Sequence, residues 1–165
     1  MIRVVVTVLL AVALLAVTAP ALQEARTDTT VERIETEADR LERVAAGLAA
    51  DSVAVGDPAL AARTSAVVTA PSGLTAAQLD RLALANATRT DTTLDGPASQ
   101  RTVVLVYRLR GEPRRAVLIP APTDGVGIVV DGGPVELRPG GESRLAFRLV
   151  DDPDGGPTIQ ISRTG

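Results

Sequence analysis

The residues of this chain best suited to chemistry are four arginines that surround one expected turn. They are Arg108, Arg110, Arg114 and Arg115. Guanidinium groups this close together favour binding of an anionic polymer, a lipid headgroup or a partner protein. Tyr107 is the only aromatic residue nearby, whereas single-stranded nucleic acid is usually bound through several stacking rings. We therefore expect an anion or partner patch and no nucleic-acid binding.

A second cluster of charge, the sequence Asp151-Asp152-Pro153-Asp154-Gly155, has the oxygen atoms that calcium prefers. An EF-hand loop needs an acid eleven residues after its first ligand. Counted from Asp152, that position is occupied by Arg163. The sequence therefore predicts the tip of a β-hairpin and no metal site.

The composition excludes most catalytic chemistry. The chain contains no histidine, cysteine or lysine, so it has no imidazole base, thiolate nucleophile or Schiff-base amine, and it lacks the usual ligands of zinc, copper and iron. None of its serines lies in a G-x-S-x-G nucleophile elbow. We therefore expect no catalytic residue, no cofactor and no small-molecule substrate, and we predict that the protein is not an enzyme.

The single asparagine begins a glycosylation sequon, Asn86-Ala87-Thr88. This pattern matters only if the surrounding domain lies outside the cell. Asn86 is therefore a candidate glycosylation site whose use depends on where the protein resides.

The location is predicted by the N-terminus, where Arg3 precedes nineteen residues, 4–22, that carry no charge. As a helix this run would measure about 28 Å, close to the ~30 Å hydrocarbon core of a bilayer. We favour an uncleaved membrane anchor with a cytoplasmic N-terminus, since Arg3 lies beside the terminal amine. Two alternatives stay open, a signal peptide cleaved at Ala19-Pro20-Ala21 and a buried core helix. The expected membrane segment is marked by Val4, Leu9, Leu10, Leu14, Leu15 and Leu22.

Residues 23–57 are expected to form an amphipathic helical stalk. Apolar residues recur at steps of three and four, and charged residues fill the other positions. The main packing seam consists of Val31, Ile34, Leu41 and Leu48. We expect this seam to pack on the protein's own β-domain or on a neighbouring protein. Pro20 and residues 27–30 are poor helix formers and predict a kink or break, and the helix should end between residues 51 and 58.

Residues 58–165 change to a period near two, which is typical of half-buried β-strands. Gly- and Pro-rich turns separate six to eight short strands, so we expect successive strands to pair as antiparallel hairpins. Residues 79–85 fit neither a helix nor a strand pattern cleanly. The predicted fold class is α+β: a hydrophobic helix (1–22) that continues into the stalk helix (23–57), then a small antiparallel β-sandwich or curled meander (58–165).

An apolar N-terminal segment, a proline at position 20, an amphipathic continuation and a C-terminal β-domain together resemble type IV pilin-like proteins and pseudopilins. All 17 basic residues are arginine and acids are in excess, a bias similar to that of halophilic archaea. The layout also resembles small uncharacterised membrane-anchored proteins of those organisms that are encoded near pilus and secretion machinery.

The resemblance implies a membrane-anchored, non-catalytic structural or assembly component of a surface or secretion complex. Its expected partners are the lipid bilayer and other membrane or surface-complex proteins. The protein would cross the cell membrane once, with its C-terminal domain extracellular. The alternative is a soluble extracellular β-domain that is released from a signal peptide and binds a ligand or partner through its arginine-rich turn.

Overall fold

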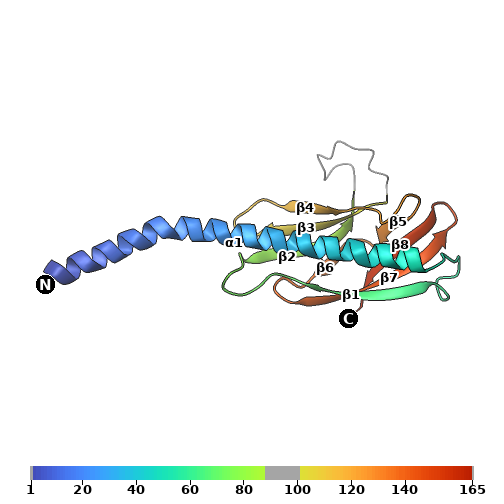
Figure 1. Ribbon diagram of the computed structural model, residues 1–165, viewed down its shortest axis with the longest axis horizontal. Helices are drawn as coiled ribbons and strands as arrows, with labels where there is room; N and C mark the ends of the chain where they lie inside the picture. The colour runs from blue at the N-terminus through green and yellow to red at the C-terminus, as the bar shows by residue number, and fades with distance from the viewer. Residues whose placement is uncertain (1, 88–100, 165) are drawn as a thin grey trace.

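The computed structural model describes residues 2–87 and 101–164 and contains one long helix followed by eight strands. This arrangement confirms the predicted α+β class. Figure 1 shows half of the helix projecting away from a β-sandwich and the other half lying along it. The elements are α1 (Ile2–Asp51), β1 (Ala62–Thr69), β2 (Leu79–Asn86), β3 (Val103–Leu109), β4 (Arg115–Ile119), β5 (Gly127–Val130), β6 (Val135–Leu137), β7 (Glu142–Asp152) and β8 (Gly156–Arg163).

The helix α1 is continuous, so the predicted break at residues 27–30 is wrong. Pro20 lies inside it, and Figure 1 shows a gentle bend in the projecting half. Two threonine hydroxyls donate hydrogen bonds back to helical carbonyls, Thr29 Oγ1 to Ala25 O and Thr30 Oγ1 to Arg26 O, each at 2.8 Å. Because their polar groups are satisfied within the helix, these threonines do not compete with its main-chain bonds, and tertiary packing of Thr30 offsets their weak helix propensity.

Two four-stranded sheets form the sandwich, with strand orders β1–β7–β8–β5 and β4–β3–β2–β6. The C-terminal half of α1 contacts β1 and β4, which are edge strands of different sheets, and also β7. The helix therefore covers the open side of the sandwich between these two edges (Figure 1). This placement buries one stripe of α1 and shields two edges that would otherwise expose unpaired main-chain groups.

The expectation that successive strands form hairpins is correct for β2–β3, β3–β4 and β7–β8 and wrong elsewhere. The turn at residues 131–134 and the turn at 138–141 carry the chain from one sheet to the other, and β5 pairs in parallel with β8. Gly132 and Gly133 have φ of 74° and 103°, in the left-handed region that glycine adopts readily. A glycine-rich turn permits a sharp change of direction but does not specify which strand the chain pairs with next.

Two strands, β2 and β3, differ from the half-buried pattern because several consecutive residues in each are buried. Residues 79–85, left unassigned by periodicity, form most of β2, which pairs with β3 on one side and β6 on the other. In β3, Val104 and Val106 are as buried as the residues that alternate with them. A strand buried on both faces loses the apolar–polar alternation on which a period of two depends.

The core joins the helix to both sheets in one cluster. Ile34, Leu41 and Ala45 of α1 are fully buried and belong to the same cluster as Phe147 and Leu105. The helix is thus part of the hydrophobic core, not an accessory packed on a finished domain.

The sandwich has two ends with different loops. We call the end from which α1 projects the base; it carries the loops 70–78, 110–114 and 138–141, as the strand registers require. The opposite end, which we call the far end, carries the segments 52–61, 120–126 and 153–155. The base thus lies next to the apolar half of α1, and the far end is remote from it (Figure 1).

Candidate membrane anchor and the base of the β-domain

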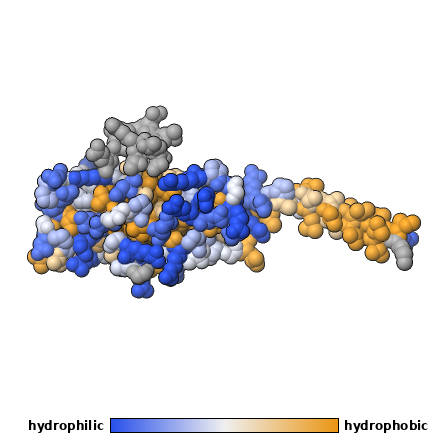
Figure 2. Space-filling view, turned by 180° about the vertical axis from the view of Figure 1, so that it is seen from behind, coloured by the Kyte–Doolittle hydropathy of each residue, from blue (hydrophilic) through white to orange (hydrophobic). Residues whose placement is uncertain are grey.

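The apolar segment projects from the β-domain with none of its side chains buried. The expected membrane residues Val4, Leu9, Leu10, Leu14, Leu15 and Leu22 have 54 to 67% of their surface exposed. By length and composition this part of α1 can cross a membrane, and 0% of it is buried inside the structure. The alternative of a buried core helix is therefore wrong. Figure 2 shows the segment as a continuous apolar rod.

The β-domain begins almost immediately after this segment. Thr30, two turns beyond Leu22, is fully buried, and its hydroxyl oxygen accepts a hydrogen bond of 2.8 Å from the Ala77 main-chain N–H. The eight residues from Leu22 to Thr30 rise about 12 Å in a helix. Hence the loop that carries Ala77 is fixed to the helix close to the end of the apolar segment.

The predicted stalk seam lies inside the sandwich. Ile34, Leu41 and Leu48 are buried and Val31 is half-buried, and all four belong to or pack against the core cluster. Of the two open alternatives for this seam, the structure has the first, in which it packs on the protein's own β-domain.

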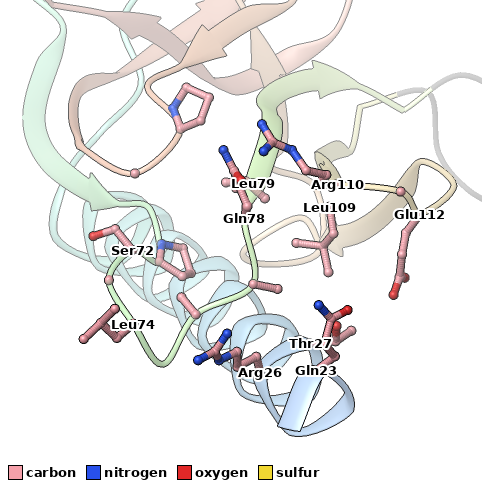
Figure 3. Close-up of a pocket in the computed structure, with 17 residues that line it drawn as sticks. Gln23, Arg26, Thr27, Ser72, Leu74, Gln78, Leu79, Leu109, Arg110 and Glu112 are labelled. Atoms are coloured by element: carbon pink, nitrogen blue, oxygen red, sulfur yellow. The ribbon is translucent and has the colours of Figure 1, made fainter. Parts of the chain in front are cut away.

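A cleft of about 910 Å³ opens at the base, between α1 and the loops 70–78, 110–114 and 138–141. Arg26 and Arg110 line it, with Glu112 and two glutamines (Figure 3). The Arg26 Nε is buried without a hydrogen-bond partner among the described residues, whereas Arg110 Nε lies 3.4 Å from Asp80 Oδ1. The cleft is therefore polar and carries cationic groups.

The four arginines predicted as one patch all belong to the β3–β4 hairpin, but their surroundings differ. Arg110 and Arg114 lie in the base loop 110–114, whereas Arg108 is exposed on β3. Arg115 begins β4, and its NH2 group lies 2.8 Å from Glu112 Oε2. The exposed arginines of the base are therefore a smaller set than the sequence suggested.

Arg115 also influences the one tyrosine, Tyr107, which is buried in the core. Burial raises the pKa of the Tyr107 phenol above its usual 10.0, because the charged phenolate loses its hydration there. The neighbouring Arg115 guanidinium offsets part of that rise in pKa. Neither effect gives the phenol an ionised form at neutral pH.

The aspartate cluster forms the β7–β8 turn, where the sequence predicted a hairpin tip. Asp152 Oδ1 accepts a hydrogen bond from the Asp154 N–H, and Asp152 Oδ2 lies 3.6 Å from an Arg101 guanidinium nitrogen. Arg101 also donates to Gly155 O, so this side chain fastens the turn. In the part of the chain that the structure describes, no group of three or more acidic side chains is placed to hold a metal ion.

Asn86 has a structural role that the sequence did not reveal. Its Nδ2 donates to Val130 O at 3.2 Å, and its Oδ1 accepts from Val130 N–H at 2.6 Å. These two bonds join β2 to β5, which belongs to the other sheet. The third residue of the predicted sequon, Thr88, lies outside the described residues. Arg101 and Thr30 were also missed, because an isolated polar residue carries no signal of a partner distant in sequence.

Comparisons with known proteins identify a family without an assigned function. Neither the curated proteins nor the solved structures gave a match. A family model, described as a domain of unknown function (DUF7311), matches residues 1–164, so it spans the apolar segment as well as the β-domain. The chain therefore belongs to the DUF7311 family.

Proposed function

We propose that this protein is a non-catalytic, single-pass membrane protein that serves as a structural or assembly component of a surface or secretion complex of the pilus-like kind. One observation carries the proposal. A single unbroken helix provides both the exposed apolar rod and part of the core of the β-domain.

The energetics of the apolar rod favour lipid as its surroundings. Ten valine and leucine side chains from Val4 to Val17 expose more than half of their surface each. A contiguous apolar surface of this size is unfavourable in water at roughly 25 cal/mol for each Å² and typically marks a membrane or protein contact. In a bilayer, the helix also satisfies its own main-chain groups, as lipid requires.

The charges around the rod support an orientation with the N-terminus in the cytoplasm. Arg3 lies before it, whereas Glu24 and Asp28 follow it with Arg26 between them. Positive charge concentrates on the cytoplasmic side of membrane helices, which supports a β-domain outside the cell.

The assembly role is supported by the rigid joint between the two parts. Since α1 continues from the rod into the core, the β-domain is held at a set position relative to the membrane segment. A component that must present a surface to neighbouring subunits benefits from such a fixed position. The resemblance to pilin-like proteins supports the same role.

The membrane part of the proposal is tested by fractionating cells that produce the protein with a C-terminal epitope. We expect the full chain to remain in membranes after carbonate extraction and to retain an N-terminus that starts at Met1 or Ile2. Added protease should remove the epitope from intact cells. A matched variant that lacks residues 2–22 should be soluble, because it loses no buried side chain.

Two results would contradict this part. A soluble product that begins at Leu22 would support the secreted alternative, and an epitope protected in intact cells would reverse the orientation.

The assembly role has its own test, in which a photo-crosslinking residue replaces Val8 or Leu15 on the rod. We expect adducts with a second polypeptide in intact membranes; adducts with lipid alone would contradict an assembly role.

A further inference from the structure

We propose that the base of the β-domain rests on the headgroup layer of the bilayer that holds the apolar segment, with Leu74 inserted at the surface and Arg26, Arg110 and Arg114 facing the lipid phosphates. The inference rests on the proposed membrane anchor. It adds a second membrane contact, made by residues far along the chain from the first.

The first step is distance. Because Thr30 is bonded to the loop 70–78 at Ala77, that loop stays within about two helical turns of Leu22, the last residue of the apolar segment. The polar interface on each side of a bilayer is several ångströms thick, as the difference between its ~30 Å core and ~40–45 Å total thickness requires. Ala77 itself lies beyond this layer, but the loop also lines the base cleft together with Gln23 and Arg26, which follow Leu22 by one and four residues. A rod that spans the core therefore brings that side of the loop to the height of the headgroups.

The second step is the exposed leucine at the tip of the loop. Leu74 is 89% exposed, the largest exposed fraction among the large apolar side chains of the described residues. Figure 3 shows it on the loop that runs beside α1, among the residues that line the cleft. The loop 70–78 contains no charged residue. An uncharged loop with an exposed leucine is well suited to shallow insertion beside the rod.

The third step is charge. Arg110, Arg114 and Arg138 lie in the base loops with Glu112 as the one acid, and Arg26 lines the cleft between these loops and α1. In contrast, each far-end segment carries an aspartate: Asp57, Asp124 and Asp154. Guanidinium groups bind phosphate through charge-assisted hydrogen bonds, and an anionic surface repels aspartate. The charge distribution therefore favours the base as the membrane-facing end.

The position of Arg26 fits this placement. Its side chain starts one turn after Leu22 and lines the base cleft. Long arginine side chains near the end of a spanning helix extend toward the headgroups. The neighbouring cleft, about 910 Å³, is large enough to admit part of a lipid headgroup.

The test uses the absence of tryptophan from the chain. A Leu74→Trp variant of the full chain carries one tryptophan at the base. The matched control, Val53→Trp, carries one at the far end, where Val53 is 82% exposed. Both are reconstituted in vesicles of phosphatidylcholine with phosphatidylglycerol, some of whose lipids bear a bromine quencher high on the acyl chain. Flotation with the vesicles checks the anchor in each sample.

We expect Leu74→Trp to show blue-shifted, quenched emission and Val53→Trp to show the emission of a solvated indole. If both proteins float with the vesicles and neither tryptophan is quenched, the inference is wrong while the anchor stands. If neither protein floats, the anchor itself fails and the inference fails with it. Equal quenching of both tryptophans would also overturn the inference, because it would mean that the domain has no preferred end.

The arginines are tested in the Leu74→Trp background with the double substitution Arg110→Gln and Arg114→Gln. In vesicles with phosphatidylglycerol we expect the double variant to be quenched less than the Leu74→Trp protein. In phosphatidylcholine alone we expect a smaller difference between the two proteins. The control Arg43→Gln, an exposed position two-thirds of the way along α1 from Arg26 to Asp51, should leave quenching unchanged. Equal quenching in all three proteins would show that the arginines take no part.

Discussion

At the scale of single residues, the most informative side chain is Tyr107, because composition makes it directly observable. The chain has one tyrosine and contains no lysine, cysteine or tryptophan. Tyr107 is therefore the only side chain whose ordinary pKa lies between about pH 8 and pH 12.

We expect the folded protein to become less stable as the pH rises above about 10. Burial raises the Tyr107 pKa in the folded state, so the unfolded chain releases its proton first and binds fewer protons in that range. Ultraviolet absorbance of the phenolate should give a midpoint above 10.0 in the folded protein and near 10.0 in urea.

A Tyr107→Phe variant is the control for this prediction. It keeps the ring in the core and removes the ionisable group, so its stability should decline less steeply above pH 10. A folded-state midpoint at or below the value in urea would contradict the assignment of burial as the dominant cause.

At the scale of elements, the joint between α1 and the loop 70–78 depends on one hydroxyl. Thr30 is fully buried, donates to a carbonyl of its own helix and accepts from Ala77 N–H. The hydrogen bond that this oxygen accepts from Ala77 thus connects the base loop to the helix.

Replacing Thr30 by valine should lower the free energy of unfolding by about 1–3 kcal/mol, because the Ala77 N–H loses the acceptor that the fully buried Thr30 hydroxyl provides. The shape of the side chain is almost unchanged, so packing contributes little to this loss. Replacing Thr30 by serine keeps the oxygen and removes one methyl group, which should cost about 0.8 kcal/mol. Urea unfolding of the detergent-solubilised chain, followed by circular dichroism, measures both; an equal loss in the two variants would contradict the role of the hydroxyl.

The elements also show how far sequence reasoning reaches. The stalk helix was predictable because its seam, from Val31 to Leu48, repeats over five turns and its chemistry is local. Most strands were predictable for the same reason, since alternation is read within one segment. The exception is β2, where Leu82, Ala83 and Leu84 are buried in succession, so the alternation that identifies a strand is absent there.

What lay beyond the sequence was the pairing of distant segments. The sequence contains no signal that β5 pairs with β8 or that Asn86 bonds to Val130, because each contact joins residues 30 or more positions apart. The base cleft could not be predicted for the same reason: α1 and three loops line it, and these four regions are far apart in the chain. Thr30 was misread because helix propensity ignores a partner 47 residues away.

At the scale of the whole molecule, α1 has two halves: an N-terminal half outside the β-domain and a C-terminal half that forms part of its hydrophobic core. No described residue between Ile2 and Leu22 is buried, whereas Ile34, Leu41 and Leu48 belong to the core.

A fragment of residues 23–165 should therefore fold, remain soluble and give a dispersed NMR spectrum. A fragment of residues 52–165 should aggregate or remain unfolded, because removal of the helix exposes the core between β1 and β4. Size-exclusion chromatography and circular dichroism of the two fragments test this division. Aggregation of the longer fragment, or a folded shorter one, would contradict it.

The continuity of α1 has a mechanical consequence. A helix of 50 residues is about 75 Å long, and within it the structure has no hinge between the rod and the core. A tilt or rotation of the apolar half is therefore transmitted as a lever motion to the aspartate-bearing loops at the opposite extremity. A force applied to those loops is carried back along the same helix to the apolar half.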